Sequence, residues 1–475
     1  MIKLFIPVLS GLLGLPMTAM AGDWATYAGG NTHTGVVTGE SVLTPAQVMQ
    51  GLKLHWKVRL PSSSDTQALY IESVVTANGT HDELFATTKD GSVTALNATS
   101  GAIDWTILLP TFKPACSNKP TGIWGTPIIE NTTLYVVDGA GQIHALDIGT
   151  GAETAGYPVQ VIDIPNLNLG NYNHSGLTGV GNSIFITTSA LGGCESTMIS
   201  HAAVISFNIG SLQVDNTFYP SGNTAAMGGE GMWGPAGVLA DPVNLTLYVA
   251  TGNVLPAKAV SPNAQAILQV DLNLQLLASN QPKLLPGGDL DFGSTPTPID
   301  VPGCPAMLSV FNKDGQLFLY DRNNIGSGPM QVLTTTVGGG SGKFIGMAAF
   351  DPSQQTLFFY NPQTSRDGSY TYGFLALKVQ AVGNPAVCSL ATAWNVQVGS
   401  PVQSHNTHAA DPVIAGGLVW VATGAGNSIA AFDEASGTLV WTTGTAMTGN
   451  TLTPPTVEDG QIFVQSGARL YAWGL

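Results

Sequence analysis

The chain has 475 residues, of which 58 are glycine and 29 are proline, while only 9% are charged and the formal net charge is −15. This composition is typical of an all-β protein with many short strands and tight turns, and it argues against a disordered chain. The negative charge argues against nucleic acid as a partner, because phosphates would be repelled from such a surface.

The first 21 residues have the features of an export signal. Lys3 supplies a positive end, residues 4–17 are largely apolar, and Ala19-Met20-Ala21 is a small-x-small cleavage site. The apolar stretch is short for a membrane span, which favours a cleaved signal over an anchor. We therefore expect residues 1–21 to be a signal peptide and residues 22–475 to be a single domain, periplasmic or secreted, without a membrane span after processing.

The chain has four cysteines, an even number, and exported proteins meet oxidising conditions, so disulfides are expected. They are Cys116, Cys194, Cys304 and Cys388. The sequence leaves their pairing open. None lies in a C-x-x-C-H motif, so we expect no covalent haem, and any electrons would leave through a separate carrier protein.

A repeat recurs along the chain at intervals of roughly 40 to 60 residues, the range expected for propeller blades. Its clearest copies end at Ala95-Leu96-Asn97 to Gly101, Ala145-Leu146-Asp147 to Gly151, and Ala431-Phe432-Asp433 to Gly437, with Trp105 and Trp441 in the strands that follow the first and third. Alternating apolar and polar residues predict half-buried strands, and the Asp, Asn and Gly residues predict turns between them.

Counting the first strand of each repeat predicts an all-β, eight-bladed β-propeller of four-stranded antiparallel blades. The expected starts are near Ser73, Gly125, Gly176, Gly234, Ser294, Gly346, Ala410 and Pro454. The eighth repeat spans only 453–473, so its outermost strand is expected to be 54–58, from the start of the mature chain. This closure would remove the last open sheet edge. If 176–220 is an insertion instead, seven blades result.

The Asp23-Trp24 pair, the Ala-x-(Asp/Asn)-x-x-(Thr/Ser)-Gly ends and the two tryptophans resemble the tryptophan-docked repeats of dehydrogenases that depend on pyrroloquinoline quinone (PQQ). The resemblance covers nearly all of the mature chain. It implies the fold and not the activity, because the non-enzymatic propeller of the outer-membrane barrel assembly machine has the same repeat.

Two segments resemble the active-site blades of the dehydrogenases. The segment from Gly231-Met232-Trp233-Gly234 to Ala250-Thr251-Gly252-Asn253 is similar to the blade that carries the tryptophan under the quinone and an asparagine on calcium, and Trp233 and Asn253 are the matching positions. The segment Gly288-Asp289-Leu290-Asp291-Phe292-Gly293 resembles the one that ends with the catalytic aspartate, which matches Asp291.

Two further matches complete the predicted site. Asn312-Lys313-Asp314-Gly315 resembles the turn whose basic residue contacts the quinone oxygens, which implies Lys313. Gly192-Gly193-Cys194-Glu195 is similar to the segment with the glutamate ligand of calcium, which implies Glu195. The adjacent cysteine pair that closes a ring over the quinone in many of these dehydrogenases is absent from this sequence.

The resemblance implies a PQQ- and calcium-dependent dehydrogenase that oxidises an alcohol or a sugar. Glu195, Asn253 and Asp291 would hold calcium, and Asp291 would take the substrate's hydroxyl proton. Lys313 would bind the quinone and stabilise negative charge on its oxygen, and Trp233 would offer it an apolar floor.

Each of these residues also has an ordinary structural explanation. Asn253 could be a turn residue, Asp291 a strand-end carboxylate, Lys313 a solvated lysine in a hairpin, Glu195 a surface residue and Trp233 a packing residue between blades. A non-catalytic propeller that serves as a protein-binding scaffold is therefore the alternative. A glycan-binding propeller is a third hypothesis, and it requires exposed aromatic side chains at the mouth of the channel.

The starts of the first strands are also expected to bring aromatic and histidine side chains toward the propeller axis. These are Trp124, His174, Phe292, Phe344, His405 and His408. His405 and His408 could pair on a metal ion, but the sequence near them offers no further ligands.

Overall fold

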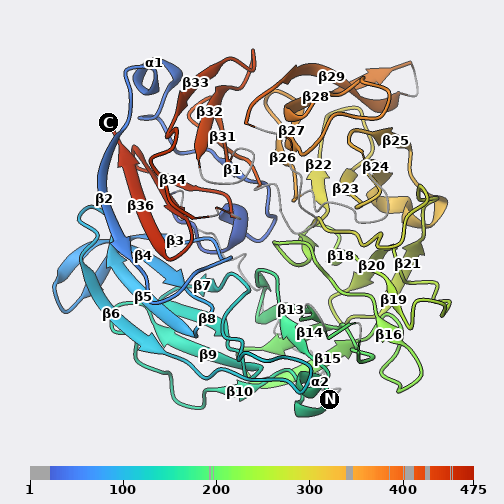
Figure 1. Ribbon diagram of the computed structural model, residues 1–475, viewed down its shortest axis with the longest axis horizontal. Helices are drawn as coiled ribbons and strands as arrows, with labels where there is room; N and C mark the ends of the chain where they lie inside the picture. Colours follow the sequence, from blue (N-terminus) through green and yellow to red (C-terminus); the bar gives the residue numbers. More distant parts are fainter. Residues whose placement is uncertain are drawn as a thin grey trace, which may run out of the picture.

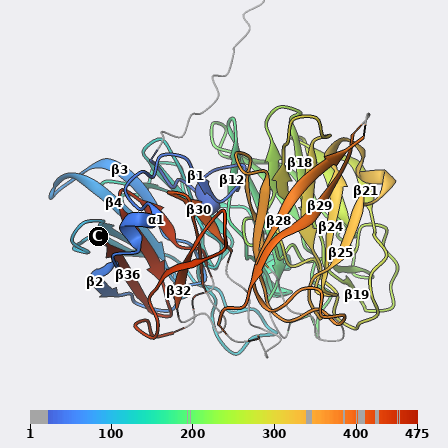
Figure 2. The same cartoon turned by 90° about the horizontal axis from the view of Figure 1, so that it is seen from above.

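The computed structural model describes residues 22–191, 194–195, 197–337, 346–383, 386–399, 401, 411–422, 428–449, 451 and 453–475. Over these residues, eight sheets of four main antiparallel strands surround a central axis (Figure 1). In the turned view of Figure 2 the strands β28 and β29 run roughly along that axis. The predicted eight-bladed β-propeller is confirmed.

Each blade contributes one strand to each of four concentric positions. The innermost strands are β3 (Leu69–Thr76), β7 (Ile128–Glu130), β12 (Thr178–Val180), β17 (Leu239–Asp241), β22 (Thr297–Ile299), β26 (Ala349–Asp351), β30 (Val413–Ala415) and β34 (Thr456–Glu458). The second strands are β4 (Gly79–Thr87), β8 (Thr133–Val137), β13 (Ser183–Ala190), β18 (Thr246–Ala250), β23 (Met307–Phe311), β27 (Thr356–Asn361), β31 (Leu418–Ala422) and β35 (Gln461–Gln465).

The two outer positions follow the same order of blades. The third strands are β5 (Ser92–Asn97), β9 (Gln142–Asp147), β14 (Val204–Asn208), β20 (Ile267–Asp271), β24 (Gln316–Asp321), β28 (Gly373–Val382), β32 (Ile429–Asp433) and β36 (Arg469–Gly474). The outermost strands are β6 (Ile103–Leu108), β10 (Val159–Gln160), β15 (Gln213–Phe218), β21 (Leu276–Asn280), β25 (Gln331–Thr334), β29 (Val387–Val396), β33 (Leu439–Thr442) and β2 (Lys53–Arg59).

A few short elements lie outside this plan. They are β1 (Val36–Val37), β11 (Asn171–Asn173), the pair β16 (Gly228–Gly229) and β19 (Val254–Leu255), the helices α1 (Pro45–Val48) and α2 (Ile164–Asn168), and the 3-10 turns η1 (Tyr27–Gly29) and η2 (Arg322–Ser327). None of the helices in the described part of the chain is long and apolar enough to cross a bilayer.

Position within a blade decides the hydrophobic pattern of a strand. β18, a second strand, is buried at all of its residues, whereas β15, an outermost strand, alternates between exposed and half-buried residues. Both faces of a second strand are covered by neighbouring blades, which requires a continuous apolar run, while an outermost strand has solvent beside it.

The ring closes through the N-terminal strand, as predicted. β2 pairs in antiparallel register with β36, with Val58 opposite Leu470, and Figure 1 shows the blue strand beside the red one.

Residues 178–218 form β12 to β15 of the third blade, so the seven-blade alternative is wrong. The first blade begins at Leu69 and not near Ser73, because β3 continues on both sides of a register shift between Ile71 and Val74.

The hydrophobic core is divided among the interfaces between adjacent blades. Between the fourth and fifth blades, for example, Tyr248 and Ile267 pack with Phe292, Phe318 and Tyr320, all of them buried. Because no blade has an apolar interior of its own, each sheet depends on its two neighbours to keep its faces from water.

A tryptophan on the outermost strand of one blade packs on a glycine turn of the next. The Trp105 indole Nε1 donates a hydrogen bond to the Ile148 carbonyl at 3.0 Å, and a Cβ on Gly151 would lie 2.7 Å from the ring. Gly151 also has φ of +70°, which favours glycine. The same contact joins Trp56 to Gly101 and Trp394 to Gly437.

The predicted repeat ends are therefore the places where blades dock. Trp441, the other tryptophan that the sequence singles out, packs edge-on against Trp473 and Trp420. Its contacts are aromatic, and they belong to the cluster that joins the seventh, eighth and first blades.

The segment that precedes β2 crosses the propeller axis. The Thr26 hydroxyl donates to the Leu177 carbonyl in the third blade at 2.7 Å, and the Tyr27 hydroxyl donates to Asp411 Oδ2 beside the seventh blade at 2.8 Å. Since these two blades are opposite each other in a ring of eight, residues 26–27 span its centre. The dark blue N-terminal part lies near the middle of the ring in Figure 1.

The same segment is bonded to other blades on either side of this crossing. Trp24 forms a β-bridge with Tyr70 of the first blade and donates from its indole to the Val457 carbonyl of the eighth. β1 pairs in parallel with β30. The segment thus ties the inner strands together independently of the strand closure.

We predict that docking can be measured with glycine substitutions. Gly151→Ala should lower Tm by about 2–4 °C more than Gly181→Ala, because both glycines have positive φ but only Gly151 touches an indole ring, while Gly181 has open space around it. In a Trp105→Ala background the difference between the two glycine variants should disappear. Differential scanning calorimetry provides the measurement, and an unchanged difference in that background would contradict the docking role of Trp105.

A second prediction concerns the buried Asp411. Burial raises its pKa from 3.8 to about 8. Between about pH 4 and pH 8 the unfolded chain has lost this proton while the folded chain keeps it, so wild-type stability should fall as the pH rises across this range. Asp411→Asn removes the titration and keeps an acceptor for Tyr27. Its Tm advantage over the wild type should be small at pH 4 and grow to about 2–5 °C at pH 8. Parallel pH profiles would contradict the assignment.

Candidate functional site

Lys313 lies in the tight turn between β23 and β24, and its side chain is buried. It is only 6% exposed. Its Nζ is 2.6 Å from Asp291 Oδ2 and 3.0 Å from Asp289 Oδ2. An ammonium group loses its hydration when it is buried, so it requires such paired carboxylates. The lysine is therefore not the solvated hairpin residue that its sequence context also allows.

The backbone around Asp291 is fixed by the turn that carries Lys313. The Lys313 amide donates to the Asp291 carbonyl at 3.1 Å, and the Asn312 side chain donates to the Leu290 carbonyl at 2.7 Å. Phe292, fully buried between two blades, anchors the next position. Because these contacts hold both backbones, the Asp291 carboxylate and the Lys313 ammonium meet at the edge of the fifth blade.

Asn253 follows β18 of the fourth blade and holds both carboxylates. Its backbone N–H donates to Asp291 Oδ1 at 2.7 Å, and its Nδ2 donates to Asp291 Oδ1 at 2.8 Å and to Asp289 Oδ1 at 2.9 Å. Its Oδ1 accepts a hydrogen bond from Gln265 at 2.8 Å. The structure thus turns the amide nitrogen toward the carboxylates and the amide oxygen, the atom that would bind a cation, toward Gln265.

Gly252 makes this close approach sterically feasible. A Cβ at this position would lie 2.2 Å from Asp291 Oδ1. The Gly252 amide also donates to the Gly231 carbonyl at 2.9 Å, and Gly231 in turn lies directly against the indole of Trp233. Two glycines therefore connect the predicted tryptophan floor to the predicted catalytic aspartate.

Glu195 comes from the third blade and interacts electrostatically with Asp291, Asp289 and Lys313. Burial raises its pKa to about 7, the negative charge of Asp291 adds to the rise, and the Lys313 ammonium opposes it. Cys194 beside it is joined to Cys116, which lies between the first two blades. This disulfide holds the Glu195 segment in place. The second disulfide joins Cys304 to Cys388.

The ionisation of the group reflects burial and the shared lysine. Burial raises the pKa of Asp291 to about 6, against the attraction of Lys313. Partial burial also raises the pKa of Asp289, but its hydrogen bond to Asp291 and the Lys313 charge lower it more, so that it ends below its usual value. The Lys313 pKa is raised because the attraction of both aspartates outweighs burial. Asp291 is therefore the carboxylate better suited to exchange a proton near neutral pH.

Aromatic rings continue from this cluster around the same end of the propeller. Ring centroids are 5.4 Å apart between Trp233 and His174, 5.8 Å between His174 and Tyr172, and 5.5 Å between Tyr172 and Trp124, each pair edge to face. The Lys89 ammonium lies 3.9 Å from the centre of the Trp124 ring. Four side chains from the second to the fourth blades thus form one wall, which we call the aromatic wall (Trp124, Tyr172, His174 and Trp233).

The structure brings the predicted site residues together and adds others. Asp289 and Gln265 contact the predicted residues directly, and sequence analysis did not assign them a role. The two-residue spacing of Asp289 and Asp291 could have indicated that both carboxylates belong to the site. The sequence near Gln265 contains no feature that indicates its contact with Asn253. Phe344, His405 and His408 lie outside the described residues. Phe292, predicted near the axis, is a core residue.

Asp289 and Asp291 supply adjacent carboxylate oxygens, the kind of ligand that Ca²⁺ prefers, and both pair with Lys313. Glu195 interacts with their charges, but its carboxylate does not form with them a group whose ligand atoms all lie within 4.8 Å of one another. Ligation by Asn253 requires its amide to turn over, so that part of the predicted ligand set stays a prediction. The Trp233 ring and the Lys313 ammonium are groups suited to a flat, anionic cofactor.

Sequence comparison finds distant relatives. The family model for outer membrane protein assembly factor BamB matches residues 21–165 and 386–473, just under half of the chain. An uncharacterized protein of Rickettsia conorii is 27% identical over 163 residues, which are 34% of this chain and 36% of that protein. The match thus spans about a third of the relative's length.

Structural comparison finds the same propeller in enzymes and in an assembly factor. A europium-containing methanol dehydrogenase superposes with a TM-score of 0.70 at 14% identity, covering 96% of this chain and 98% of the enzyme. The quinohemoprotein alcohol dehydrogenase from Comamonas testosteroni gives 0.67 at 17% identity, covering 96% and 81%. BamB from Moraxella catarrhalis gives 0.53 at 15% identity, covering 89% and 100%.

These identities are low enough that the superpositions bear on the fold alone. The docked tryptophans, the eight blades and the matching family model agree with one another. They support the resemblance of this chain to PQQ-repeat β-propellers.

Proposed function

We propose that the chain is an exported dehydrogenase that uses PQQ and a hard cation, calcium or a similar ion, to oxidise an alcohol or a sugar. The observation that supports this best is the buried pair of Asp291 and Lys313, which the partly exposed Asp289 and Asn253 contact, so that three separate segments of the fourth and fifth blades meet. A buried lysine held between two carboxylates contributes little net stability compared with apolar packing, so its presence favours a chemical role.

The proposed chemistry assigns a separate task to each side chain. PQQ, when bound with a cation, supplies an electrophilic carbonyl that accepts the hydride from the substrate carbon. Asp291 takes the hydroxyl proton, for which a pKa of about 6 is suitable. Lys313 stabilises negative charge on the cofactor oxygen, Glu195 and Asp291 supply cation ligands with Asn253 after rotation of its amide, and Trp233 forms the floor.

Asp289 extends the proposed ligand set beyond what calcium alone requires. It adds a further carboxylate beside Asp291, and one of the structurally similar enzymes is described as europium-containing. A trivalent ion gains more than a divalent ion from an added negative charge. We therefore include lanthanide ions among the cations that the site would bind.

The aromatic wall is proposed to contact the substrate. Trp124, His174 and Trp233 are half-buried and not fully covered. The faces of such rings pack well against the C–H groups of alcohols and sugars. Electrons would leave through a separate carrier protein, and the two disulfides agree with an exported, periplasmic or secreted protein.

A scaffold role is the second candidate, and one observation favours it. The residues that match the BamB family model are 21–165 and 386–473, whereas the cluster of Asn253, Asp289, Asp291 and Lys313 lies outside both ranges. The half of the ring opposite the site is thus the part that most resembles an assembly factor. Such a protein would bind a polypeptide partner and no quinone.

A binding titration separates the two candidates. The mature chain should bind PQQ saturably, with quenching of tryptophan fluorescence, when Ca²⁺ or Eu³⁺ is present, because the cation and the cofactor share ligands. Asp291→Ala and Asn253→Ala should each weaken this binding at least tenfold, the loss expected when a ligand is removed.

Asp241→Ala is the matched control for Asp291→Ala. Asp241 is equally buried and also faces a basic side chain, Arg322, but it lies at the turn between β17 and β18, at the other end of the strands from the turn that carries Lys313. Its loss should leave PQQ affinity within about twofold. If the wild-type chain binds no PQQ with either cation, the dehydrogenase proposal fails and the scaffold role becomes the better account.

The role of Lys313 can be separated from its effect on stability. Lys313→Met should lower Tm, since Asp291 would be buried without a positive partner, and should also weaken PQQ binding at least tenfold. Arg322→Met removes another buried cation of the same blade, one that pairs with Asp241 and Asp300. It should lower Tm without changing PQQ affinity. Equal effects of the two variants on PQQ affinity would contradict the role proposed for Lys313.

A further inference from the structure

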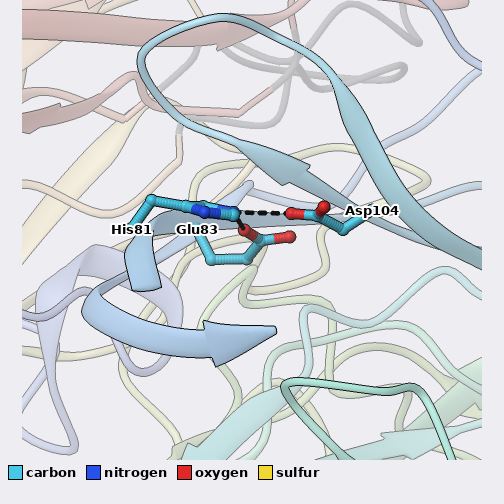
Figure 3. A group of neighbouring side chains, drawn as sticks. All are labelled: His81, Glu83 and Asp104. Atoms are coloured by element: carbon cyan, nitrogen blue, oxygen red, sulfur yellow. Dashed lines mark hydrogen bonds and ion pairs between the residues drawn. The ribbon is translucent and has the colours of Figure 1, made fainter. Parts of the chain in front are cut away.

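A second cluster of ionisable side chains lies in the first blade, away from the candidate site. His81 and Glu83 are on β4, two residues apart and therefore on one face of the strand, and Asp104 is on β6. Figure 3 shows the three side chains pointing toward one another. One ligand atom from each lies within 4.8 Å of the others.

The cluster lies at the opposite end of the propeller from the candidate site. His81 and Glu83 are near the start of β4, next to its turn with β3, whereas Lys313 is in a turn between second and third strands. In an antiparallel sheet these two kinds of turn are at opposite ends of the strands. Its properties are therefore independent of the proposed dehydrogenase chemistry.

The geometry leaves one carboxylate without a hydrogen bond. His81 Nε2 is 2.6 Å from Asp104 Oδ2, with which it forms a hydrogen bond, and 2.8 Å from Glu83 Oε2. A ring nitrogen carries at most one hydrogen, so a full hydrogen bond to Asp104 leaves none for Glu83. The other Asp104 oxygen accepts a hydrogen bond from the Asn78 amide.

Glu83 is the side chain that this arrangement leaves unsatisfied. It has no exposed surface, and neither of its carboxylate oxygens has a hydrogen-bond donor among the described residues. A buried carboxylate in this state is costly unless a proton or a cation neutralises it. Burial, with the negative charge of Asp104 next to it, raises the pKa of Glu83 to about 9.

We propose that this cluster is a binding site for one divalent transition metal ion, for which Zn²⁺ is the probe, held by His81 Nε2 and by carboxylate oxygens of Glu83 and Asp104. One imidazole nitrogen with two carboxylate oxygens is a ligand set suited to Zn²⁺ and neighbouring ions, whereas Ca²⁺ and Mg²⁺ prefer oxygen alone. Three protein ligands leave a fourth position for a water molecule.

The metal would join strands that do not pair with each other. β4 and β6 are both bonded to β5 and not to one another. The ion would connect them at the end of the first blade, close to the point where the N-terminal segment meets Tyr70 of β3. His81 is 17% exposed in its side chain, which gives the ion a route from solvent.

A similar group in the second blade provides a control. His144 is flanked by Glu153 Oε2 at 2.7 Å from Nδ1 and by Asp138 Oδ2 at 3.2 Å from Nε2. The carboxylates therefore face opposite ring nitrogens, and each can accept its own N–H from a protonated ring. Such an arrangement satisfies both acids without a metal and cannot place both around one ion.

The test is equilibrium Zn²⁺ binding to the chelator-treated mature chain, measured by competition with a chromogenic chelator. We expect one site per chain, weakened about 100-fold or more in His81→Ala and in Glu83→Gln and unchanged in His144→Ala. Asp291→Ala should also leave this site unchanged, which separates it from the proposed cofactor site. Glu83→Gln keeps the size of the side chain and does not require a proton or a cation at this buried position, so that variant should fold, and circular dichroism checks this.

Two results would overturn the proposal. One is a wild-type chain that binds no Zn²⁺ at a concentration well above that of the protein. The other is stoichiometric binding that persists in folded Glu83→Gln and in His81→Ala. As a second readout, Zn²⁺ should raise the Tm of the wild type and of His144→Ala but not that of Glu83→Gln.

Discussion

The burial of each blade against its two neighbours is the interaction on which the rest of the structure depends. The sheets have no apolar interior of their own, and the core is found between them. A ring with one missing contact would expose two apolar faces, so closure contributes to the stability of every blade. The docking of Trp105 on Gly151, and the equivalent contacts of Trp56 and Trp394, join the outermost strand of one blade to a turn of the next.

Closure also explains how residues far apart in sequence reach one site. Asn253, Asp291 and Lys313 are brought together because adjacent blades present their turns at the same end of the ring, and Glu195 arrives from the third blade. Burial then sets their chemistry. Lysine and aspartate are ordinary ionisable groups in water, but here Lys313 and Asp291 form a buried ion pair, and burial raises the pKa of Asp291 to about 6.

The periodic part of the fold was predictable from the sequence, and the aperiodic part was not. The repeat ends at Gly101, Gly151 and Gly437 mark docking turns, and the incomplete last repeat required a strand from the N-terminus, which is β2. The first strand was predicted to start near Ser73 but starts at Leu69. Ser73 has a positive φ, and the register shift beside it interrupts the alternation of apolar and polar residues along the strand. The axial crossing at Tyr27 has no sequence signal, since its partner Asp411 is a single distant residue.

The same division holds for the site. Trp233, Asn253, Asp291, Lys313 and Glu195 could be located because they lie in motifs, and the structure brings them to one end of the propeller. The orientation of the Asn253 amide depends on Gln265, the burial of Lys313 on Asp289, and the position of Glu195 on the Cys116–Cys194 disulfide. These contacts join segments that are far apart in the sequence, and they cannot be predicted from a single sequence.

The most direct test of the central claim, that the group around Asp291 and Lys313 is a cation site, is sensitised Eu³⁺ luminescence. With tryptophan excitation, the wild-type chain should transfer energy to a bound ion near Trp233, and Ca²⁺ should compete for the same site. Emission should be lost in Asp291→Asn and kept in His81→Ala. Equal emission from the wild type and from Asp291→Asn would contradict the account.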